Sequence, residues 1–205
     1  MREITVIPDN EIDQYVRDIF AKYTSKGAHA YDHTKRVHKL ALHIGKIVGA
    51  NPRILGAASL LHDIGRSQEA VTGKSHSILS GEMGRKILQN VGYSADEIEQ
   101  VVSAIRSHRY SEGLEPTSLE GEVLSDADKL DAMGAIGVFR GIAHATVTCR
   151  GIDGFLTHAD EKLLKLHGLM FTQEGARLAK IRHSNLESFI ELLTKEMQGE
   201  GITDS

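Results

Sequence analysis

The chain has 205 residues, of which 40% are hydrophobic and 25% are charged, and these proportions are typical of a soluble globular protein with one full core. Its net charge of -4 argues against a nucleic-acid partner, because nucleic-acid binders are usually strongly basic. The single cysteine excludes an intramolecular disulfide, and neither a signal peptide nor a membrane-spanning apolar run is visible. We therefore expect a cytoplasmic protein without a membrane partner.

Hydrophobic residues recur at helical spacing from the start of the chain. Asp9 or Asn10 could cap a first helix. A second helix is expected from about Asp32, and it should stop at Gly49.

The third helix has signals at both ends. The Asn51-Pro52 pair is typical of a helix N-terminus, with an N-cap followed by proline in the first turn. Gly65 is expected to be the left-handed residue after the helix end, so that the helix finishes on His62 and Asp63.

The later elements are also predicted to be helical. Ser75 should open a helix that ends near Gly92, and Ser94 with Glu97 has the spacing of a capping box. Further helices are expected at about 118–133, from there to about residue 149, at about 158–167 and at 173–197.

These patterns predict an all-α protein. Alternating strand patterns, fixed repeats and Pro-rich or Ser-rich linkers are absent from the sequence. We expect one domain over residues 1–205, with a core at about 28–135, C-terminal helices at 136–198 packed on it, and a frayed tail at 199–205.

Polar residues interrupt the inward, apolar stripes of several predicted helices. They are His33, His62, His108, Asp128 and Asp131. Burying each charged group separately would cost several kcal/mol, whereas a shared cation would offset that cost. Imidazole and carboxylate together suit a divalent metal such as Mn, Fe, Co, Ni or Zn. The pattern therefore indicates a buried metal site that includes the His62-Asp63 pair.

Four segments resemble the HD-domain superfamily of metal-dependent phosphohydrolases. They are YDHTKRVHKLA at 31–41, AASLLHDIGR at 57–66, IRSHR at 105–109 and SDADKLDAMGAIGVFRG at 125–141. The last segment, with KLLKLHGLM at 162–170 and the Arg182-His183 pair, resembles a small stand-alone subgroup that includes nucleoside triphosphate pyrophosphohydrolases. The resemblance implies a compact helical bundle with a central metal. The implied ligands are His33, His62, Asp63 and Asp128.

The resemblance also implies the cofactor. We expect one divalent cation, with Mn²⁺ first and Mg²⁺, Co²⁺, Ni²⁺, Fe²⁺ or Zn²⁺ as alternatives. Some HD proteins hold a second metal with two further histidines between the His-Asp pair and the last Asp. His76 and His108 lie in that interval. We interpret them as lining the phosphate pocket, which leaves a second metal open.

Residues around the ligands are candidates for catalysis and substrate binding. Arg66 stands where some nucleotidases of this superfamily have a Glu; it could bind a phosphate oxygen or be a helix-end charge. Asp131 could orient the attacking water or hold a ligand histidine. The catalytic candidates are thus Asp63, Arg66 and Asp131. The substrate-binding candidates are His29, Arg66, His76, His108, Lys129, Lys162, Lys165 and Arg182.

The expected function is hydrolysis of nucleotides by a metal-dependent phosphohydrolase. We expect a (deoxy)nucleoside triphosphate pyrophosphohydrolase, because Arg66 replaces the nucleotidase Glu and the C-terminal cations suit a longer phosphate chain. The alternatives are a general nucleotidase or phosphodiesterase, a di-iron HD oxygenase, and a non-catalytic nucleotide sensor. The expected partner is a small nucleotide, and a homodimer is compatible with the sequence.

Overall fold

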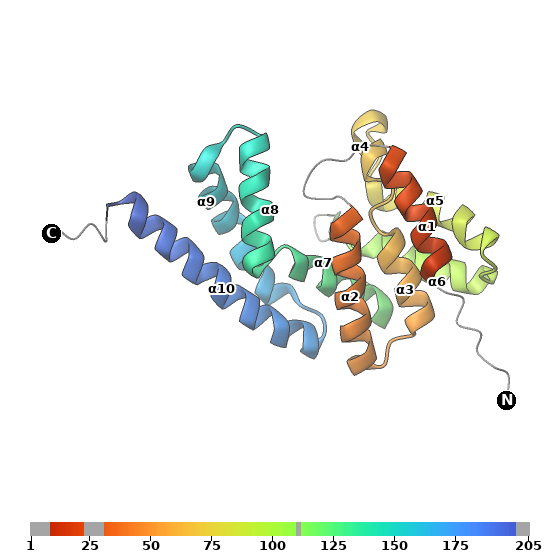
Figure 1. Cartoon of the computed structure of the whole chain (residues 1–205). Helices are drawn as coiled ribbons and strands as arrows, with labels where there is room; N and C mark the ends of the chain where they lie inside the picture. Colours follow the sequence, from red (N-terminus) through yellow and green to blue (C-terminus); the bar gives the residue numbers. More distant parts are fainter. Residues whose placement is uncertain (1–8, 23–30, 110–111, 200–205) are drawn as a thin grey trace. The chain divides into compact units, whose positions relative to one another are not determined.

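The computed structural model describes residues 9–22, 31–109 and 112–199, and every regular element within these ranges is helical. The prediction of an all-α fold is therefore confirmed (Figure 1). The chain forms two compact units, one up to Asp128 and the other from Lys129. Within the described residues, no helix combines the length and the apolar character needed to cross a membrane.

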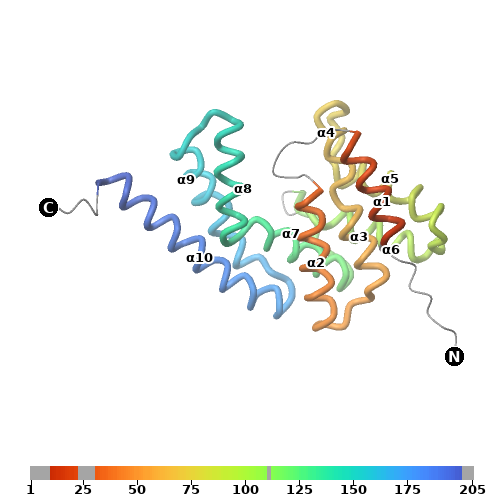
Figure 2. Tube along the Cα trace, viewed as in Figure 1, coloured from red at the N-terminus to blue at the C-terminus, as the bar shows by residue number. Residues whose placement is uncertain are grey.

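The first unit is a bundle whose interior is made by the apolar stripes of its helices. Within it, α2 packs along α3, and α5 packs along α6, as the trace in Figure 2 shows. Leu55, Ile105 and Leu124 come from three different helices and are completely buried in this interior. The elements are α1 (Asp9–Lys22), α2 (Tyr31–Val48), α3 (Pro52–Leu61), α4 (Arg66–Thr72), α5 (His76–Asn90), α6 (Ala95–Ser107) and all but the end of α7 (Leu119–Asp131).

Local capping signals set the starts of three of these helices, as predicted. The Asn51 side chain accepts hydrogen bonds from the backbone of Arg53 and Ile54, at the start of α3. Ser94 and Glu97 form a reciprocal capping box at the start of α6. Ser75 caps α5 by accepting from the backbone of Ser77.

Gly65 has a different role from the predicted one. Its φ is -84°, so it is not a left-handed residue after a helix end, and α3 already stops at Leu61. Instead, Gly65 lies against α5: a Cβ at this position would be 2.6 Å from both Leu79 Cβ and the Ser80 nitrogen. The Gly65 N–H also donates to Ser80 Oγ at 2.9 Å. The glycine is therefore required for the close approach between this turn and α5.

The sequence did not predict α4, which follows Gly65. This helix has seven residues and none of them is buried. Because it has no buried stripe, hydrophobic periodicity could not reveal it.

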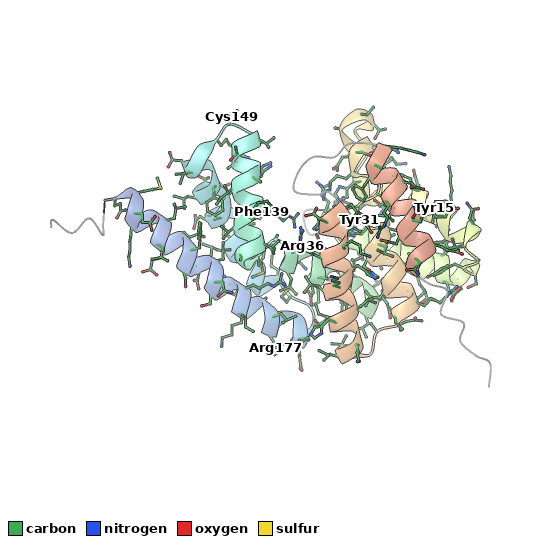
Figure 3. All side chains as sticks on the ribbon, in the orientation of Figure 1. Tyr15, Tyr31, Arg36, Phe139, Cys149 and Arg177 are labelled. Carbon is green, nitrogen blue, oxygen red and sulfur yellow. The ribbon has the colours of Figure 1, made fainter. Side chains whose placement is uncertain are left out.

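The second unit contains α8 (Gly134–Val147), α9 (Gly151–Glu161), the 3₁₀ helix η2 (Leu163–Leu169) and α10 (Gln173–Met197). α10 packs against α8 and η2, and α8 also packs against α9. Cys149, labelled in Figure 3, lies in the exposed turn between α8 and α9, and its thiol is free.

The prediction of one helix over 158–167 is wrong. The α-helix ends at Glu161, and a 3₁₀ helix follows. The buried residues Phe155, Ala159, Leu163 and Leu166 keep a helical spacing across this break. Hydrophobic periodicity alone therefore could not locate it.

Candidate metal centre

Asp63 lies at the centre of the polar cluster in the first unit. It is only 1% exposed and occupies the turn between α3 and α4. On one side, His33 Nε2 and His62 Nε2 lie 3.6 Å and 3.9 Å from Asp63 Oδ2. On the other side, His76 Nε2 and His108 Nε2 lie 3.2 Å and 3.8 Å from Asp63 Oδ1. The carboxylate therefore separates two pairs of imidazoles, one facing each oxygen.

The first group consists of His33, His62 and Asp128, whose ligand atoms all lie within 4.8 Å of one another. His33 comes from the first turn of α2, His62 is the C-cap of α3, and Asp128 lies on α7. His33 Nε2 is 3.3 Å from His62 Nε2 and 3.4 Å from Asp128 Oδ1. The structure thus brings together the four residues that the sequence predicted as ligands, since Asp63 adjoins this group.

The second group consists of Asp63, His76 and His108, again with ligand atoms within 4.8 Å of one another. His76 opens α5 and His108 is the C-cap of α6. All three residues are buried. From the sequence we interpret His76 and His108 as lining a phosphate pocket, which leaves a second metal open. In the structure, these two histidines and Asp63 are arranged as the ligands of a second cation would be.

The hydrogen bonds of the outer ring nitrogens orient three of these imidazoles. His62 Nδ1 lies 2.8 Å from the Ser59 carbonyl, and His108 Nδ1 lies 2.6 Å from the Ile105 carbonyl. His76 Nδ1 lies 3.0 Å from Glu69 Oε2. An acceptor at Nδ1 places the proton there, which leaves the Nε2 lone pair facing Asp63 or its neighbours.

The protonation states also fit a cation. Burial lowers the pKa of His62, His76 and His108, so these imidazoles are neutral near pH 7. Burial alone would raise the pKa of Asp128, but the hydrogen bond with His33 holds this pKa well below its usual range. Neutral imidazole and ionised carboxylate are the forms that bind metals.

One contact tests the fit directly. With its proton on Nδ1, His76 directs the Nε2 lone pair at Asp63 Oδ1 from 3.2 Å, and this buried nitrogen has no hydrogen-bond partner. Two lone pairs facing each other in a buried site repel, and a cation held by both atoms would remove that repulsion. The donors present therefore fit a divalent metal.

Arg66 lies beside the ligands. Its Nε donates to Asp63 Oδ2 at 3.0 Å, and its side chain is 29% exposed. Because Arg66 begins α4 and α3 ends at Leu61, its predicted alternative as a charge at the C-terminus of a helix is wrong. The guanidinium instead lies between a buried carboxylate and solvent.

Two further predicted site residues, His29 and Asp131, are not among the residues of the two ligand groups. His29 falls outside the described residues. Asp131 is buried in the second unit, where its Oδ2 accepts from Arg140 Nη1 at 2.7 Å. Its proposed part in orienting water stays a prediction.

The predicted cations of the second unit have varied surroundings. Lys129 is 4% exposed, with its Nζ 4.4 Å from the centre of the Phe171 ring. Arg182 donates to the Leu130 carbonyl. Lys162 and Lys165 are exposed around the start of η2. Their roles in substrate binding stay predictions.

The family is decided by comparison with known proteins. The model of the HD domain family matches residues 30–133, a range that contains all five of His33, His62, Asp63, His108 and Asp128. The chain belongs to the HD domain family. This result confirms the resemblance inferred from the sequence motifs.

Relatives extend the similarity along nearly the whole chain. The uncharacterised protein YpgQ of Bacillus subtilis is 30% identical over 195 residues, which cover 92% of this chain and 93% of YpgQ. The crystal structure of YpgQ in complex with ADP matches with a TM-score of 0.75 and 28% identity, covering 92% of this chain and 94% of that one. A predicted HD-superfamily hydrolase from an uncultured Thermotogales bacterium matches with a TM-score of 0.70 and 31% identity, covering 92% of each chain.

Family and site agree on a general activity. Two of the similar structures are those of an HD-superfamily hydrolase from Bacillus thuringiensis and of a predicted hydrolase of that superfamily, and the His and Asp groups of this chain can hold divalent metal. The protein is thus an HD-superfamily hydrolase with a metal-dependent site.

Proposed function

We propose that the protein is a metal-dependent nucleotide phosphohydrolase, and more specifically a (deoxy)nucleoside triphosphate pyrophosphohydrolase. The observation that carries the proposal is the partly exposed guanidinium of Arg66 on the Asp63 carboxylate, which faces both ligand groups. A planar cation at the edge of a metal site suits a phosphate oxygen. The nucleotide class is supported by the related protein YpgQ, which was crystallised with ADP.

The residues of the chain have distinct parts in this reaction. A divalent cation, for which Mn²⁺ is our first candidate, would polarise a phosphoryl oxygen and lower the pKa of water. Asp63, which is buried, and Asp128, whose side chain is 29% exposed, would hold that cation with the neutral imidazoles. Arg66 would bind the phosphoryl oxygens and stabilise the charge that grows on them. The oxygen of a water molecule would then bond to the α-phosphorus while the bond from that phosphorus to the bridging oxygen breaks and pyrophosphate leaves with the electron pair. Of the two protons of the water, one would pass to the leaving pyrophosphate and the other to solvent.

The products distinguish this activity from the alternatives. With dGTP or ATP and Mn²⁺, we expect nucleoside monophosphate and pyrophosphate in equal amounts as the first products. Anion-exchange chromatography and phosphorus NMR of early time points measure both. Orthophosphate with nucleoside diphosphate, or faster cleavage of monophosphates, would overturn the proposal in favour of a general phosphatase. Nucleotide binding without turnover would favour a sensor.

Arg66→Ala should impair catalysis while the metal stays bound. Loss of a charge-assisted hydrogen bond to phosphate costs about 1.5–3 kcal/mol, which corresponds to a decrease of roughly 10- to 150-fold in kcat/KM. Steady-state kinetics measure the loss of kcat/KM, and the metal content of the purified variant shows whether the metal stays bound. Arg85→Ala, which removes an exposed arginine bound to Glu99, is the control and should keep wild-type kinetics. Unchanged kinetics of Arg66→Ala would remove Arg66 from the substrate site.

A di-iron oxygenase is the second candidate, and the grouping of His76 and His108 around Asp63 favours it. That activity would need two irons per chain, one in each ligand group. Iron content, the optical change on reduction and the consumption of oxygen test it. A protein that binds two irons and consumes oxygen, and that leaves nucleotides intact, would replace the hydrolase proposal.

A further inference from the structure

Glu69 links α4 to the first residue of α5. Its Oε2 accepts from His76 Nδ1 at 3.0 Å, and its Oε1 accepts from the backbone N–H of the same residue at 3.3 Å. The two oxygens of one carboxylate therefore hold both the ring and the backbone of His76. His62 and His108 differ from His76, because their outer nitrogens face backbone carbonyls three residues earlier in the chain.

Glu69 is itself held by arginines. Arg109 Nη1 donates to Glu69 Oε1 at 2.8 Å, and Arg66 Nη1 lies 3.9 Å from Oε2. A carboxylate that lies beside two arginines is an acceptor only, so it accepts the proton of His76 Nδ1.

The support continues beyond Arg109. Arg109 also contacts Glu112 at 3.3 Å, and Glu112 accepts from Ser77 Oγ at 2.8 Å and from Ser75 Oγ. Ser75 is the N-cap of α5. The network thus starts and ends at the first turn of α5, which fixes Glu69 relative to His76.

We propose that Glu69 is a positioning residue that sets the tautomer and the ring orientation of His76 and so completes the second ligand group. The inference rests on the metal centre of the proposed function. Because His76 donates its Nδ1 proton in a hydrogen bond to Glu69 Oε2, it presents the Nε2 lone pair towards Asp63 Oδ1, 3.2 Å away. A carboxylate that fixes a ligand histidine in this way raises metal affinity, and its removal typically costs about 10- to 100-fold.

Glu69→Ala tests the inference without any nucleotide. In the metal-free wild-type protein, ¹⁵N NMR of the histidine rings should find His76 with its proton on Nδ1, and in the variant this preference should be lost. Calorimetric titration with Mn²⁺ should find two cations per wild-type chain. In the variant the affinity for one of them should fall by about 10- to 100-fold, while the other stays as in the wild type. Glu99→Ala removes an exposed carboxylate bound to Arg85 and should change neither result.

Glu69→Gln is the second variant, and it tests the role of Glu69 even if Glu69→Ala does not fold. The amide oxygen of Gln can still accept from His76 Nδ1, so the tautomer should persist and the loss of affinity should be smaller than in Glu69→Ala. A single cation per wild-type chain, an unchanged His76 tautomer in Glu69→Ala, or a Gln variant as weak as the alanine variant would each overturn it. A wild-type protein that binds metal as expected but cleaves no nucleotide would count against the proposed function alone.

Discussion

Asp63→Asn should leave the chain without a firmly held metal in either ligand group. Asp63 faces His33 and His62 with one oxygen and His76 and His108 with the other. Its loss should lower metal affinity by more than the roughly 10- to 100-fold cost of losing an outer-shell partner, and turnover should fall at least as far. Metal content after dialysis against Mn²⁺, calorimetric titration and the rate of nucleotide hydrolysis measure the effect.

Asp128→Asn is the matched variant, because Asp128 belongs to the His33 and His62 group alone. Asp128→Asn should weaken the binding of one cation and leave the binding of the other unchanged, whereas Asp63→Asn should weaken the binding of both. Far-UV circular dichroism should stay unchanged in both variants, since the apolar stripes that form the helices remain. An Asp63→Asn protein with wild-type metal content and rate would place the metal centre elsewhere.

Gly65→Ala should destabilise the fold and weaken the metal centre together. The new Cβ would lie 2.6 Å from Leu79 Cβ and from the backbone nitrogen of Ser80, so the turn and α5 must move apart. Overpacking of this kind costs about 1–3 kcal/mol. For a chain of this size, each kcal/mol lowers Tm by roughly 2–4 °C. Because the turn carries Asp63 and α5 begins with His76, metal affinity should fall as well.

Thermal unfolding followed by circular dichroism and titration with Mn²⁺ measure these two effects. Gly168→Ala is the control, since no atom lies within 4 Å of a Cβ built there and its φ is not in the left-handed region. It should leave both Tm and metal affinity unchanged. An unchanged Tm in Gly65→Ala would mean that the turn adapts without cost, contrary to the close contact with α5.

Several features of the fold could be predicted because their causes are local. Asn51 and Ser94 cap helices through backbone groups two or three residues away, and such short-range bonds can be recognised from spacing alone. The inward positions of His33 and His62 follow from the apolar residues one or two turns away on the same helix. The presence of a buried polar cluster could therefore be predicted without the structure.

Other features depend on segments that meet only in the folded chain. Gly65 has an ordinary negative φ, and the need for glycine arises from the backbone of α5, about 15 residues later. Glu69 lies on a helix without buried residues, so no periodicity singles it out, and its bond to His76 exists only because α4 turns back onto α5.

By itself, the sequence determined the all-α fold, the HD family motifs and the residue types of a divalent-metal site. Their causes lie within one or two helical turns, where hydrogen bonds and apolar spacing act along the chain. The tertiary structure alone decided that Asp63 stands between two pairs of histidines and that Glu69 supports His76. Those arrangements join residues from α2 to α7, and contacts between separate helices depend on how the helices pack rather than on the pattern within any one of them.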